Sequence, residues 1–437
     1  MDMELLSRIQ FAFTVSFHII FPSFSIGLAT FLVIIEGIYL KTGQGIYYQI
    51  AKFWTKIFAL TFGMGIVAGI VMEFQLGTNW GGFAKHVGSI LGPLFIYEVL
   101  TAFFIEAGFI GIVVFGWNLV GKRLHYLATV MVCLGTTISA YWIMTANTWM
   151  QHPVGYQFIN DKFIASDWSA VIFNSHVFTR FSHMLLASYI VAALAITSTS
   201  CYYLYNNKFI EFAKCSLQIS FTMLAISIPL QVFVGDISGL HVYEYQPMKT
   251  AALEGVWNTQ QGAPLLLFAI PSNTHQQNYL EVGIPKLASL LNTHLLNGTL
   301  AGLDSVTPQD QPEVWIVFYS FRIMVGIGVL LLAYIMTVAY LMYRQKFFTD
   351  QRILKLSQYL FPLGFIAVLT GWFTAEVGRQ PWIVYGLIRT SDAISNVSVH
   401  SVLISLSLII VVYGIVFGYF YCHYIKKTIQ NGPEILH

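Results

Sequence analysis

Residues 371–382 read Gly371-Trp372-Phe373-Thr374-Ala375-Glu376-Val377-Gly378-Arg379-Gln380-Pro381-Trp382. This stretch ends an apolar segment, 358–378, that is long enough to cross a lipid bilayer as a helix. It also places a carboxylate, an arginine and two tryptophans at the membrane boundary. Ionisable groups are costly in a membrane unless they pair with each other or bind a ligand, so they indicate a functional site. The stretch therefore predicts a spanning helix with a site at its end.

The composition of the whole chain predicts the same class of protein. Of its 437 residues, 56% are hydrophobic and 10% are charged, and the mean hydropathy is +0.67. Soluble domains carry about 25% charged residues, so this chain is predicted to lie in a membrane. The net charge of +2 argues against nucleic acid as a partner. The N-terminus has no basic region and no small-residue cleavage site, so the first apolar segment is expected to be retained as a span.

Apolar runs of about 20 residues predict nine transmembrane helices. They cover residues 10–40, 54–79, 93–119, 124–149, 177–205, 215–240, 313–343, 358–378 and 396–424. No Pro/Gly/Ser-rich linker or internal repeat divides the chain, so residues 1–437 are expected to form one all-α integral-membrane bundle. A polar stretch, 241–312, separates the sixth and seventh helices, and a loop of that length is usually functional or disordered.

The distribution of basic residues predicts how the chain is oriented in the membrane. The connections after the first, third, fifth and seventh helices, together with the C-terminal tail, contain 13 of the 22 lysines and arginines. The connections on the other side are longer and contain fewer. The positive-inside rule therefore places the C-terminus in the cytoplasm and the N-terminus and the 241–312 loop outside.

Histidine, methionine and arginine side chains inside the predicted helices are candidates for binding a haem. His18 lies in the first helix, His183 in the fifth, and Arg322 and Met324 in the seventh. Histidine and methionine are the usual axial ligands of haem iron in electron-transfer sites, and arginine can pair with a propionate. Each residue also has a structural alternative, which is an interhelical hydrogen bond for histidine and core packing for methionine.

Buried carboxylates are a second group of candidates. Glu98 and Glu106 lie eight residues apart on the third helix, about 12 Å along its axis, and are expected to project from nearly the same face. Two acids on one face suggest a proton relay, or an iron ligand with a proton donor behind it. Glu73, Asp236 and Glu376 are further acids in or near apolar segments. Salt bridges can account for only some of these acids, because few basic residues lie within the spans.

Several of these segments, taken in order, resemble subunit I of the cytochrome bd quinol oxidases. The resemblance covers residues 1 to about 425 and is carried by the segments 72–80, 98–106, 146–151, 321–324 and 371–382, with the segment around His183. The individual pieces are short, but their order and spacing together are specific. The resemblance implies a haem-bearing membrane enzyme that oxidises quinol and reduces oxygen to water without copper, separating charge across the membrane.

Carried over position by position, the resemblance implies roles for the candidate haem ligands. His183 and Met324 match the axial ligands of a low-spin haem b, and His18 matches the histidine ligand of a high-spin haem. Glu98 and Glu376 match carboxylates at the high-spin haems, with Glu376 among the iron ligands. The other residues match neighbours of these sites. Glu106 matches a residue on the proton path toward the oxygen site, and Arg322 lies where a propionate partner would be. Trp372 and Arg379 match residues packed between or beside the haems.

The outer loop resembles the quinol-oxidising segment of the same family. Lys249 and Glu254 match the residues associated with quinol oxidation, where one side chain can hydrogen-bond a quinol oxygen and the other can accept its proton. The stretch from Lys249 to Arg322 is short, as in the short-loop branch of the family, some members of which are thought to use haem b in place of haem d and to resist cyanide. The third haem is therefore expected to be haem d or a further haem b.

The resemblance also implies partners and a location. It implies a second large integral-membrane subunit, subunit II, alone or with a small accessory subunit, in a bacterial cytoplasmic (inner) membrane with a periplasmic 241–312 loop. Two other classes remain open on the residues alone. A secondary transporter would usually show repeats and broken helices, and a haem–copper oxidase would need several clustered histidines, whereas the twelve histidines here are scattered.

Overall fold

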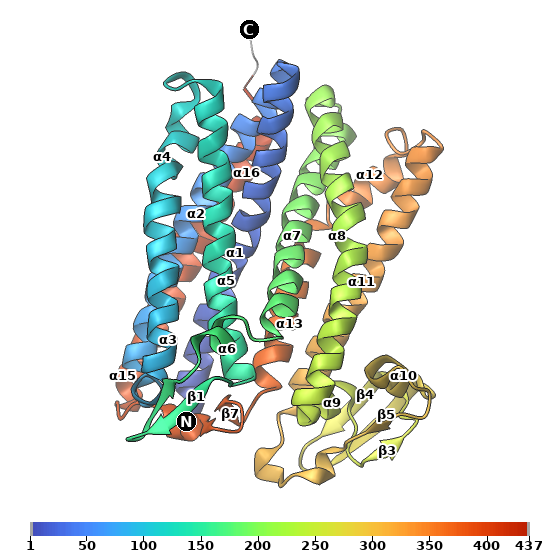
Figure 1. The fold of residues 1–437 in the computed structure, drawn as a ribbon. Helices are drawn as coiled ribbons and strands as arrows, with labels where there is room; N and C mark the ends of the chain where they lie inside the picture. The colour runs from blue at the N-terminus through green and yellow to red at the C-terminus, as the bar shows by residue number, and fades with distance from the viewer. Residues whose placement is uncertain (1–2, 435–437) are drawn as a thin grey trace.

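The computed structural model describes residues 3–434, except for the side chains of residues 103 and 416. Within this part of the chain, nine helices are long and apolar enough to cross a membrane. They stand side by side in one bundle, with the N-terminus at one end and the C-terminus at the other (Figure 1). The predicted all-α integral-membrane bundle of nine spans is therefore confirmed.

The spans are built from sixteen helical elements among the described residues, because several spans are interrupted. In chain order these are α1 (Met3–Thr42), α2 (Gly45–Thr78), α3 (Gly81–Thr101), the π-helix η1 (Ala102–Ala107), α4 (Gly108–Phe115), the 3₁₀ turn η2 (Gly116–Asn118), α5 (Lys122–Gln151), α6 (Trp168–Ile172), α7 (Val177–Tyr205), α8 (Ile210–Tyr245), α11 (Val314–Tyr343), α12 (Gln351–Ser357), α13 (Phe361–Val377), α15 (Val399–Val412), the π-helix η5 (Tyr413–Tyr421) and α16 (Cys422–Asn431). Elements α3 to η2 form the third span, and α15 to α16 form the ninth.

Several helices extend beyond the ranges expected from hydropathy. The second begins at Gly45 rather than 54, the third begins at Gly81 rather than 93, and the sixth ends at Tyr245 rather than 240. A hydrophobic window finds only the part of a helix that lies in lipid, about 20 residues. The 40 residues of α1 span about 60 Å, so the helix ends project well past a hydrocarbon core of about 30 Å.

The 241–312 stretch is ordered rather than structureless. It contains the end of α8, α9 (Pro247–Glu254), β3 (Gln260–Gln261), β4 (Leu265–Ser272), β5 (Gln277–Ile284), α10 (Leu287–Thr293), β6 (Thr299–Leu300) and the 3₁₀ turns η3 (Leu303–Ser305) and η4 (Pro308–Asp310). Strands β4 and β5 pair antiparallel, as do β3 and β6. In Figure 1 this outer subdomain lies below the ends of α8 and α11.

Two other short segments cover the same end of the bundle. The hairpin β1 (Tyr156–Ile159) and β2 (Lys162–Ala165) follows α5, and β7 (Trp382–Val384), β8 (Ile388–Arg389) and α14 (Thr390–Ala393) follow α13. The side chain of Arg389 is paired with Asp310 and lies over the ring of Trp382, 4.7 Å from its centroid. These contacts join the end of the outer subdomain to the β7–β8 hairpin.

The core of the bundle forms where α1 packs against α7. A Cβ atom added at Gly27 would lie 2.2 Å from the main-chain oxygen of Ser188, so only glycine permits this close approach. Buried aromatic side chains, such as Phe31 of α1 and Trp54 of α2, complete the core. This tight packing fixes α1 and α7 as the frame on which His18 and His183 are carried.

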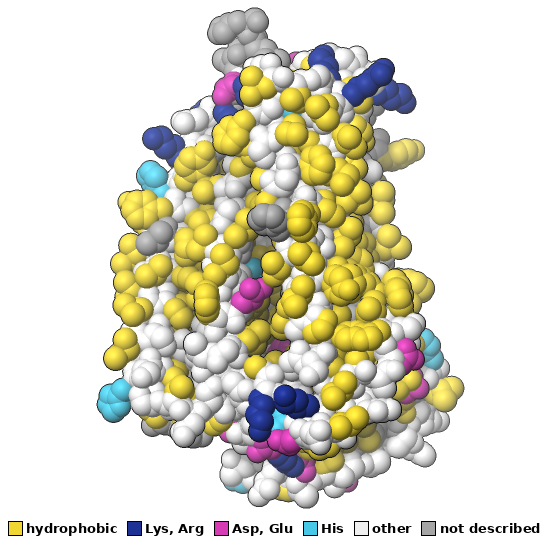
Figure 2. Space-filling model, turned by 60° about the vertical axis from the view of Figure 1, so that its left-hand side comes forward, with side chains coloured by type: hydrophobic (Ala, Val, Ile, Leu, Met, Phe, Trp, Pro, Cys, Tyr) yellow, Lys and Arg dark blue, Asp and Glu magenta, His cyan; other side chains and the backbone are white. Residues whose placement is uncertain are grey.

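The lipid-facing surface is apolar around the middle of the molecule, with charged side chains at both ends (Figure 2). The apolar band is hollowed at mid-height, and acidic atoms show within the hollow (Figure 2). A groove of about 390 Å³ on α2 and α3 is lined by Glu73, several small residues, and Phe83 and Phe95. Glu73 is exposed on this face, and an exposed acid in a lipid-facing span is costly.

Candidate functional site

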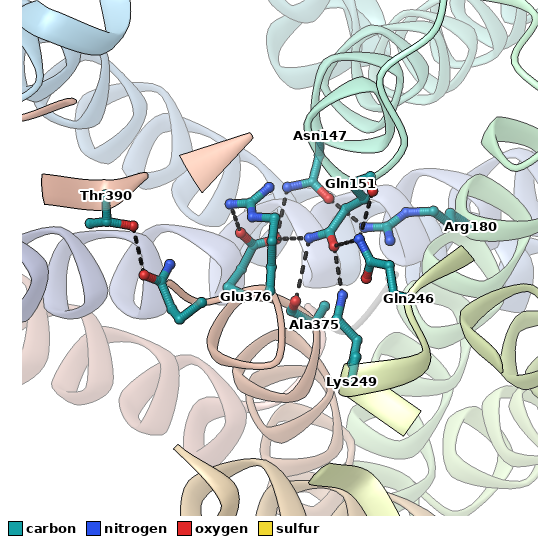
Figure 3. Close-up of polar contacts among 10 residues, drawn as sticks. Asn147, Gln151, Arg180, Gln246, Lys249, Ala375, Glu376 and Thr390 are labelled. Carbon is teal, nitrogen blue, oxygen red and sulfur yellow. Dashed lines mark hydrogen bonds and ion pairs between the residues drawn. The ribbon is translucent and has the colours of Figure 1, made fainter. Parts of the chain in front are cut away.

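A cluster of buried polar side chains lies where α5, α7, α9 and α13 meet, at the end of the bundle that carries the 241–312 segment (Figure 3). Glu376, at the end of α13, accepts hydrogen bonds from the Nδ2 of Asn147 at 2.9 Å and from the Nε2 of Gln151 at 3.1 Å. Its other oxygen is paired with the Nη2 of Arg379 at 2.5 Å. The cluster therefore surrounds the carboxyl group of Glu376 with one cation and two amides, at the end of the helix where the sequence predicts a site.

Lys249 joins the same cluster from the outer subdomain. Its Nζ donates to the Oε1 of Gln151 at 2.6 Å, and Gln246 donates to the main-chain oxygen and the Oε1 of Gln151. No carboxylate lies within ion-pair distance of Lys249 among the described residues. Burial lowers the pKa of the Lys249 ammonium well below its usual range, and the guanidinium of Arg180 lowers it further. Lys249 is thus a buried amine suited to take up a proton.

Glu254 faces a different set of partners, although it lies on the same short helix. Five residues along an α-helix correspond to a turn of about 140° in net direction, so Lys249 and Glu254 point to different sides. The Oε2 of Glu254 is paired with the Nη2 of Arg322 at 2.7 Å, and its Oε1 accepts from the Nδ2 of Asn292 at 3.0 Å. Arg322 also donates through Nε to the main-chain oxygen of Leu266. The arginine expected beside a propionate is therefore turned toward the outer subdomain.

The two expected ligands of the low-spin haem each lie opposite a glycine on a neighbouring helix. A Cβ atom at Gly235 of α8 would lie 3.4 Å from the Cε1 of His183, and one at Gly371 of α13 would lie 2.8 Å from the Sδ of Met324. The Nδ1 of His183 is buried and has no hydrogen-bond partner among the described residues. A buried polar atom without a partner is unusual in a protein interior. An imidazole and a thioether kept clear by glycines fit a haem.

His18 has the same character in α1. A Cβ atom at Gly69 of α2 would lie 3.2 Å from its Cε1, and its Nδ1 is buried without a partner in the described part of the chain. The Nδ1 atoms of His18 and His183 therefore have no interhelical partner among the described residues. His18 does form a hydrogen bond with the main chain of Gly65 on α2, so its structural alternative is present, whereas the imidazole of His183 is suited to iron ligation.

Glu98 and Glu106 both face α5, as their spacing predicted. The Oε1 of Glu98 accepts from the Oγ of Ser139 at 2.8 Å, and the Cγ of Glu106 packs where a Cβ of Gly135 would stand. Ser139 and Gly135 are one turn apart on the same side of α5. Glu106 lies in the π-helix η1, an irregularity that is frequent at functional sites and that sequence periodicity does not reveal.

Two guanidinium groups near Glu376 have donors to spare. The Nε and Nη1 of Arg379, and the Nε of Arg180, are buried without a partner among the described residues. Arg180 also donates to the Oδ1 of Asn147. Unpaired buried cationic donors fit an anionic group such as a propionate. Trp372, one turn before Glu376 in α13, packs against Phe373 with ring centroids 5.6 Å apart.

The structure adds residues that sequence reasoning did not single out. Gln246 and Asn292 complete the surroundings of Lys249 and Glu254, and Arg180 completes those of Asn147. A second buried pair joins the Nδ1 of His125 to the Oε2 of Glu36 at 2.9 Å. The only signal in the sequence was that these polar residues lie in or next to apolar segments, and that signal does not identify their partners.

These features together define a multi-pass membrane protein with imidazole, thioether and carboxylate side chains that could hold haem, and with a buried polar cluster at one end. Residues 6–433 match the family model described as cytochrome bd terminal oxidase subunit I. The chain belongs to this family. It is subunit I of a terminal quinol oxidase, a multi-subunit enzyme with haem cofactors and a quinol substrate, and the transporter alternative is not favoured.

Individual relatives agree along nearly the whole chain. The cytochrome bd ubiquinol oxidase subunit 1 of Bacillus subtilis (strain 168) is 34% identical over 442 residues, covering 98% of this chain and 94% of the relative. The cytochrome bd-II ubiquinol oxidase subunit 1 of Escherichia coli (strain K12) is 32% identical over 505 residues, covering 100% and 98%. A chain of the solved bd oxidase from Geobacillus thermodenitrificans superposes with a TM-score of 0.92 at 28% identity, covering 99% of both chains.

Proposed function

We propose that this chain oxidises membrane quinol at its outer subdomain and passes the electrons inward to a paired oxygen-reducing site. Two quinols and one O₂ would give two quinones and two waters, with four electrons passing through the chain. The observation that carries the proposal is the hydrogen-bonded connection from Lys249 through Gln151 to Glu376, because it joins the outer subdomain to the site at the end of α13.

The proposed cofactor sites follow the geometry around the buried ligands. His183 and Met324 would hold a low-spin haem b. His18 would hold either a high-spin haem b or the third haem, and that third haem would be haem d or a further haem b. Glu98 and Glu376 would serve the high-spin pair. Bound haem supplies one-electron transfer and oxygen reduction. Arg379, with its unpaired donors, would neutralise a propionate, and Trp372 would pack beside the macrocycle.

Quinol binding would use the two buried residues of α9. The amine of Lys249, whose pKa burial lowers well below its usual range, would accept a hydrogen bond and then a proton from one quinol hydroxyl. Glu254, held by Arg322 and Asn292, would orient the second hydroxyl and accept its proton. Both residues lie outside the predicted membrane core, so their protons would be released outside.

The proton route for oxygen reduction would run on the opposite side of the bundle. The distribution of lysine and arginine supports a cytoplasmic C-terminus and a periplasmic 241–312 subdomain. Glu106 then lies nearer the cytoplasm than Glu98, and both face α5. Taking up protons inside and releasing them outside would generate a membrane potential without a separate pump.

A second integral-membrane subunit, subunit II, is proposed as the partner, alone or with a small accessory subunit. The support is the groove on α2 and α3, where Glu73 is exposed on a face that would otherwise meet lipid. Isolating a charge or a polar group in hydrocarbon is costly, so a protein surface is the more stable cover.

The proposed function is tested by changing the quinol lysine while leaving the haem ligands intact. Lys249→Met in the purified complex should slow quinol-dependent oxygen consumption by about a hundredfold, the scale of lost general-base catalysis, with an unchanged reduced-minus-oxidised spectrum. Lys162→Met, at an exposed lysine of β2 at the same end of the molecule, is the matched control and should turn over normally. A complex without haem bands, or a Lys249→Met variant with wild-type turnover, would overturn the proposal.

A further inference from the structure

Three histidine rings pack against each other beside the Lys249 cluster, and the function above does not use them. His152 follows the end of α5, His176 precedes α7, and His241 lies near the end of α8. The ring centroids of His152 and His176 are 4.8 Å apart, and those of His176 and His241 are 4.4 Å apart. Three elements that are distant in sequence therefore bring three imidazoles into one continuous stack.

The stack adjoins the hydrogen-bonded chain of Lys249 at two points. His152 directly follows Gln151, the acceptor of the Lys249 amine. Tyr245 directly precedes Gln246, and its ring lies 4.4 Å from that of His152 and 4.5 Å from that of His176. Tyr245 and His152 thus place the histidine stack next to the residues that hold the buried lysine.

Exposure increases away from the middle of the stack. His176 is buried, whereas His152 and His241 are half-buried and Glu244, the acid that acts on both of them, is exposed to solvent. Arg180 is the cation that acts on His176, and Asp236, farther back along α8, is paired with His294 of α10. The centre of the stack is therefore buried, and its acidic end is exposed to solvent.

Few hydrogen bonds hold the three rings in the described part of the chain. The Nδ1 of His176 lies 3.1 Å from both the Oδ1 of Asn174 and the Oγ of Ser175, so it can donate to the amide oxygen or accept from the hydroxyl. The Nδ1 of His241 is buried without a partner among the described residues. Burial lowers the pKa of the His152 imidazole, and the charge of Glu244 partly offsets that shift.

The alternative use of three histidines, a metal site, does not suit this arrangement. The described part of the chain has no group of three or more His, Cys, Asp or Glu side chains placed to hold a metal ion. The rings pack edge to face, with interplanar angles of 70° between His152 and His176 and 79° between His176 and His241. A relay of single protons between imidazoles is the chemistry that this packing permits.

The geometry points to a proton-release relay in which His152, His176 and His241 carry protons from quinol oxidation to the outer aqueous phase at Glu244. This inference rests on the proposed quinol site at Lys249. Each quinol that gives up two electrons also gives up two protons, and a proton taken by the Lys249 amine must leave before the next turnover. The relay returns that amine to its uncharged form and moves the proton to water. The protons therefore balance in this step without a further reactant.

The test uses the intact complex in proteoliposomes with a pH indicator outside. His241→Gln should slow steady-state quinol oxidation and outward proton release several-fold, with the haem spectrum and the KM for quinol unchanged. Imidazole added outside should restore the rate, because a diffusing base can replace the missing ring. His275→Gln, at an exposed histidine of the outer subdomain, is the matched control and should behave as wild type.

The outcomes separate this inference from the quinol site itself. Wild-type rates in His241→Gln and His176→Gln, or a loss that external imidazole does not restore, overturn the relay while Lys249→Met remains inactive. Stoichiometric zinc binding that is lost in the same variants would also overturn it, in favour of a metal site. If His176→Gln does not assemble, His241→Gln decides, because its Nδ1 makes no hydrogen bond in the described structure and its replacement removes none there.

Discussion

The Nζ of Lys249 donates to the Oε1 of Gln151 at 2.6 Å, and the amide of the same Gln151 donates to Glu376 at 3.1 Å. One side chain at the end of α5 thus bridges the outer subdomain and the carboxylate at the end of α13 (Figure 3). A glutamine is suited to this place because its amide has both an acceptor for the lysine and a donor for the carboxylate.

Replacing this bridge should uncouple the quinol site from Glu376. Gln151→Leu has a similar volume but no polar atoms, so Lys249 and Gln246 would lose their acceptor in a buried place, at a cost of about 1–3 kcal/mol. We expect quinol oxidation to fall at least about tenfold in kcat with the haem content retained. Steady-state kinetics against Gln157→Leu, an exposed glutamine of β1, would check this. Equal kinetics in the two variants would show that the bridge has no role.

Met324 and Gly371 give a prediction about the low-spin haem. A thioether ligand helps to keep haem iron low-spin and raises its potential, so Met324→Leu should shift the low-spin signal toward high-spin and slow haem reduction by quinol. Gly371→Ala should act in the same direction without touching the ligand, because the new methyl group would lie 2.8 Å from the Met324 sulfur.

The control for this pair is Gly328→Ala in α11, where an added Cβ meets nothing within 4 Å. Optical and electron paramagnetic resonance spectra of the three variants report the spin state directly. His183→Ala should remove the same haem. A normal low-spin signal in both Met324→Leu and His183→Ala would mean that other residues bind this haem.

The ion pair of Glu254 and Arg322 predicts different effects for its two supporting residues. Arg322→Met would leave a buried carboxylate without its cation and should destabilise the outer subdomain by about 3 kcal/mol. Asn292→Ala removes one hydrogen bond and should cost about 1 kcal/mol while raising the KM for quinol. Thermal unfolding and quinol titrations would measure both, with Asn297→Ala as the exposed control. A KM unchanged in Asn292→Ala would remove Glu254 from quinol binding.

Glu106 tests the proton route to the oxygen site. Glu106→Gln keeps the shape of the side chain in η1 but cannot carry a proton, so haem reduction by quinol should stay fast while oxygen turnover and membrane potential fall strongly. Glu106→Asp retains the carboxyl group and should recover part of the loss. Stopped-flow reduction, oxygen electrode and potential-sensitive dye would separate these steps. Full turnover with a normal potential in Glu106→Gln would exclude this route.

The C-terminal segment gives a prediction about pH and stability. Glu434 is paired with Lys52 at 2.8 Å and with Lys56 at 2.5 Å, and hydrogen bonds from these lysines lower the pKa of Glu434 to about 2. A carboxylate with a depressed pKa contributes stability above its usual pKa of about 4.3 and loses that contribution as the pH falls toward 2.

Glu434→Gln should therefore lower the unfolding temperature at pH 7, and the difference from wild type should shrink between about pH 4.3 and pH 2. Because the pair is largely exposed, the effect should stay below about 1 kcal/mol and weaken with salt. Differential scanning calorimetry of the complex at several pH values would measure it, with Glu211→Gln as an exposed control on the same side. A difference that grows on acidification would contradict the sign of this contribution.

The sequence by itself determined the class of the protein and the nine spans, and it predicted which residues bind haem. Long apolar runs can only satisfy their backbone hydrogen bonds in lipid as helices, so hydropathy alone predicts a helical bundle. The same physics makes His18, His183, Glu98 and Glu106 conspicuous, because a polar side chain within such a run is costly without a function. The spacing of Glu98 and Glu106 also predicted their common face toward α5 correctly.

The tertiary structure alone decided which of these residues meet. The observed helices end beyond their predicted boundaries because hydropathy reports only the part of a helix in contact with lipid. A helix continues into water as long as its own hydrogen bonds persist. The outer 241–312 stretch proved to be ordered because its short strands and helices pack on the ends of α8 and α11, which no local pattern records. Gln151 bridges Lys249 and Glu376, Arg322 turns to Glu254, and three histidines stack, because contacts between distant segments depend on how the helices pack.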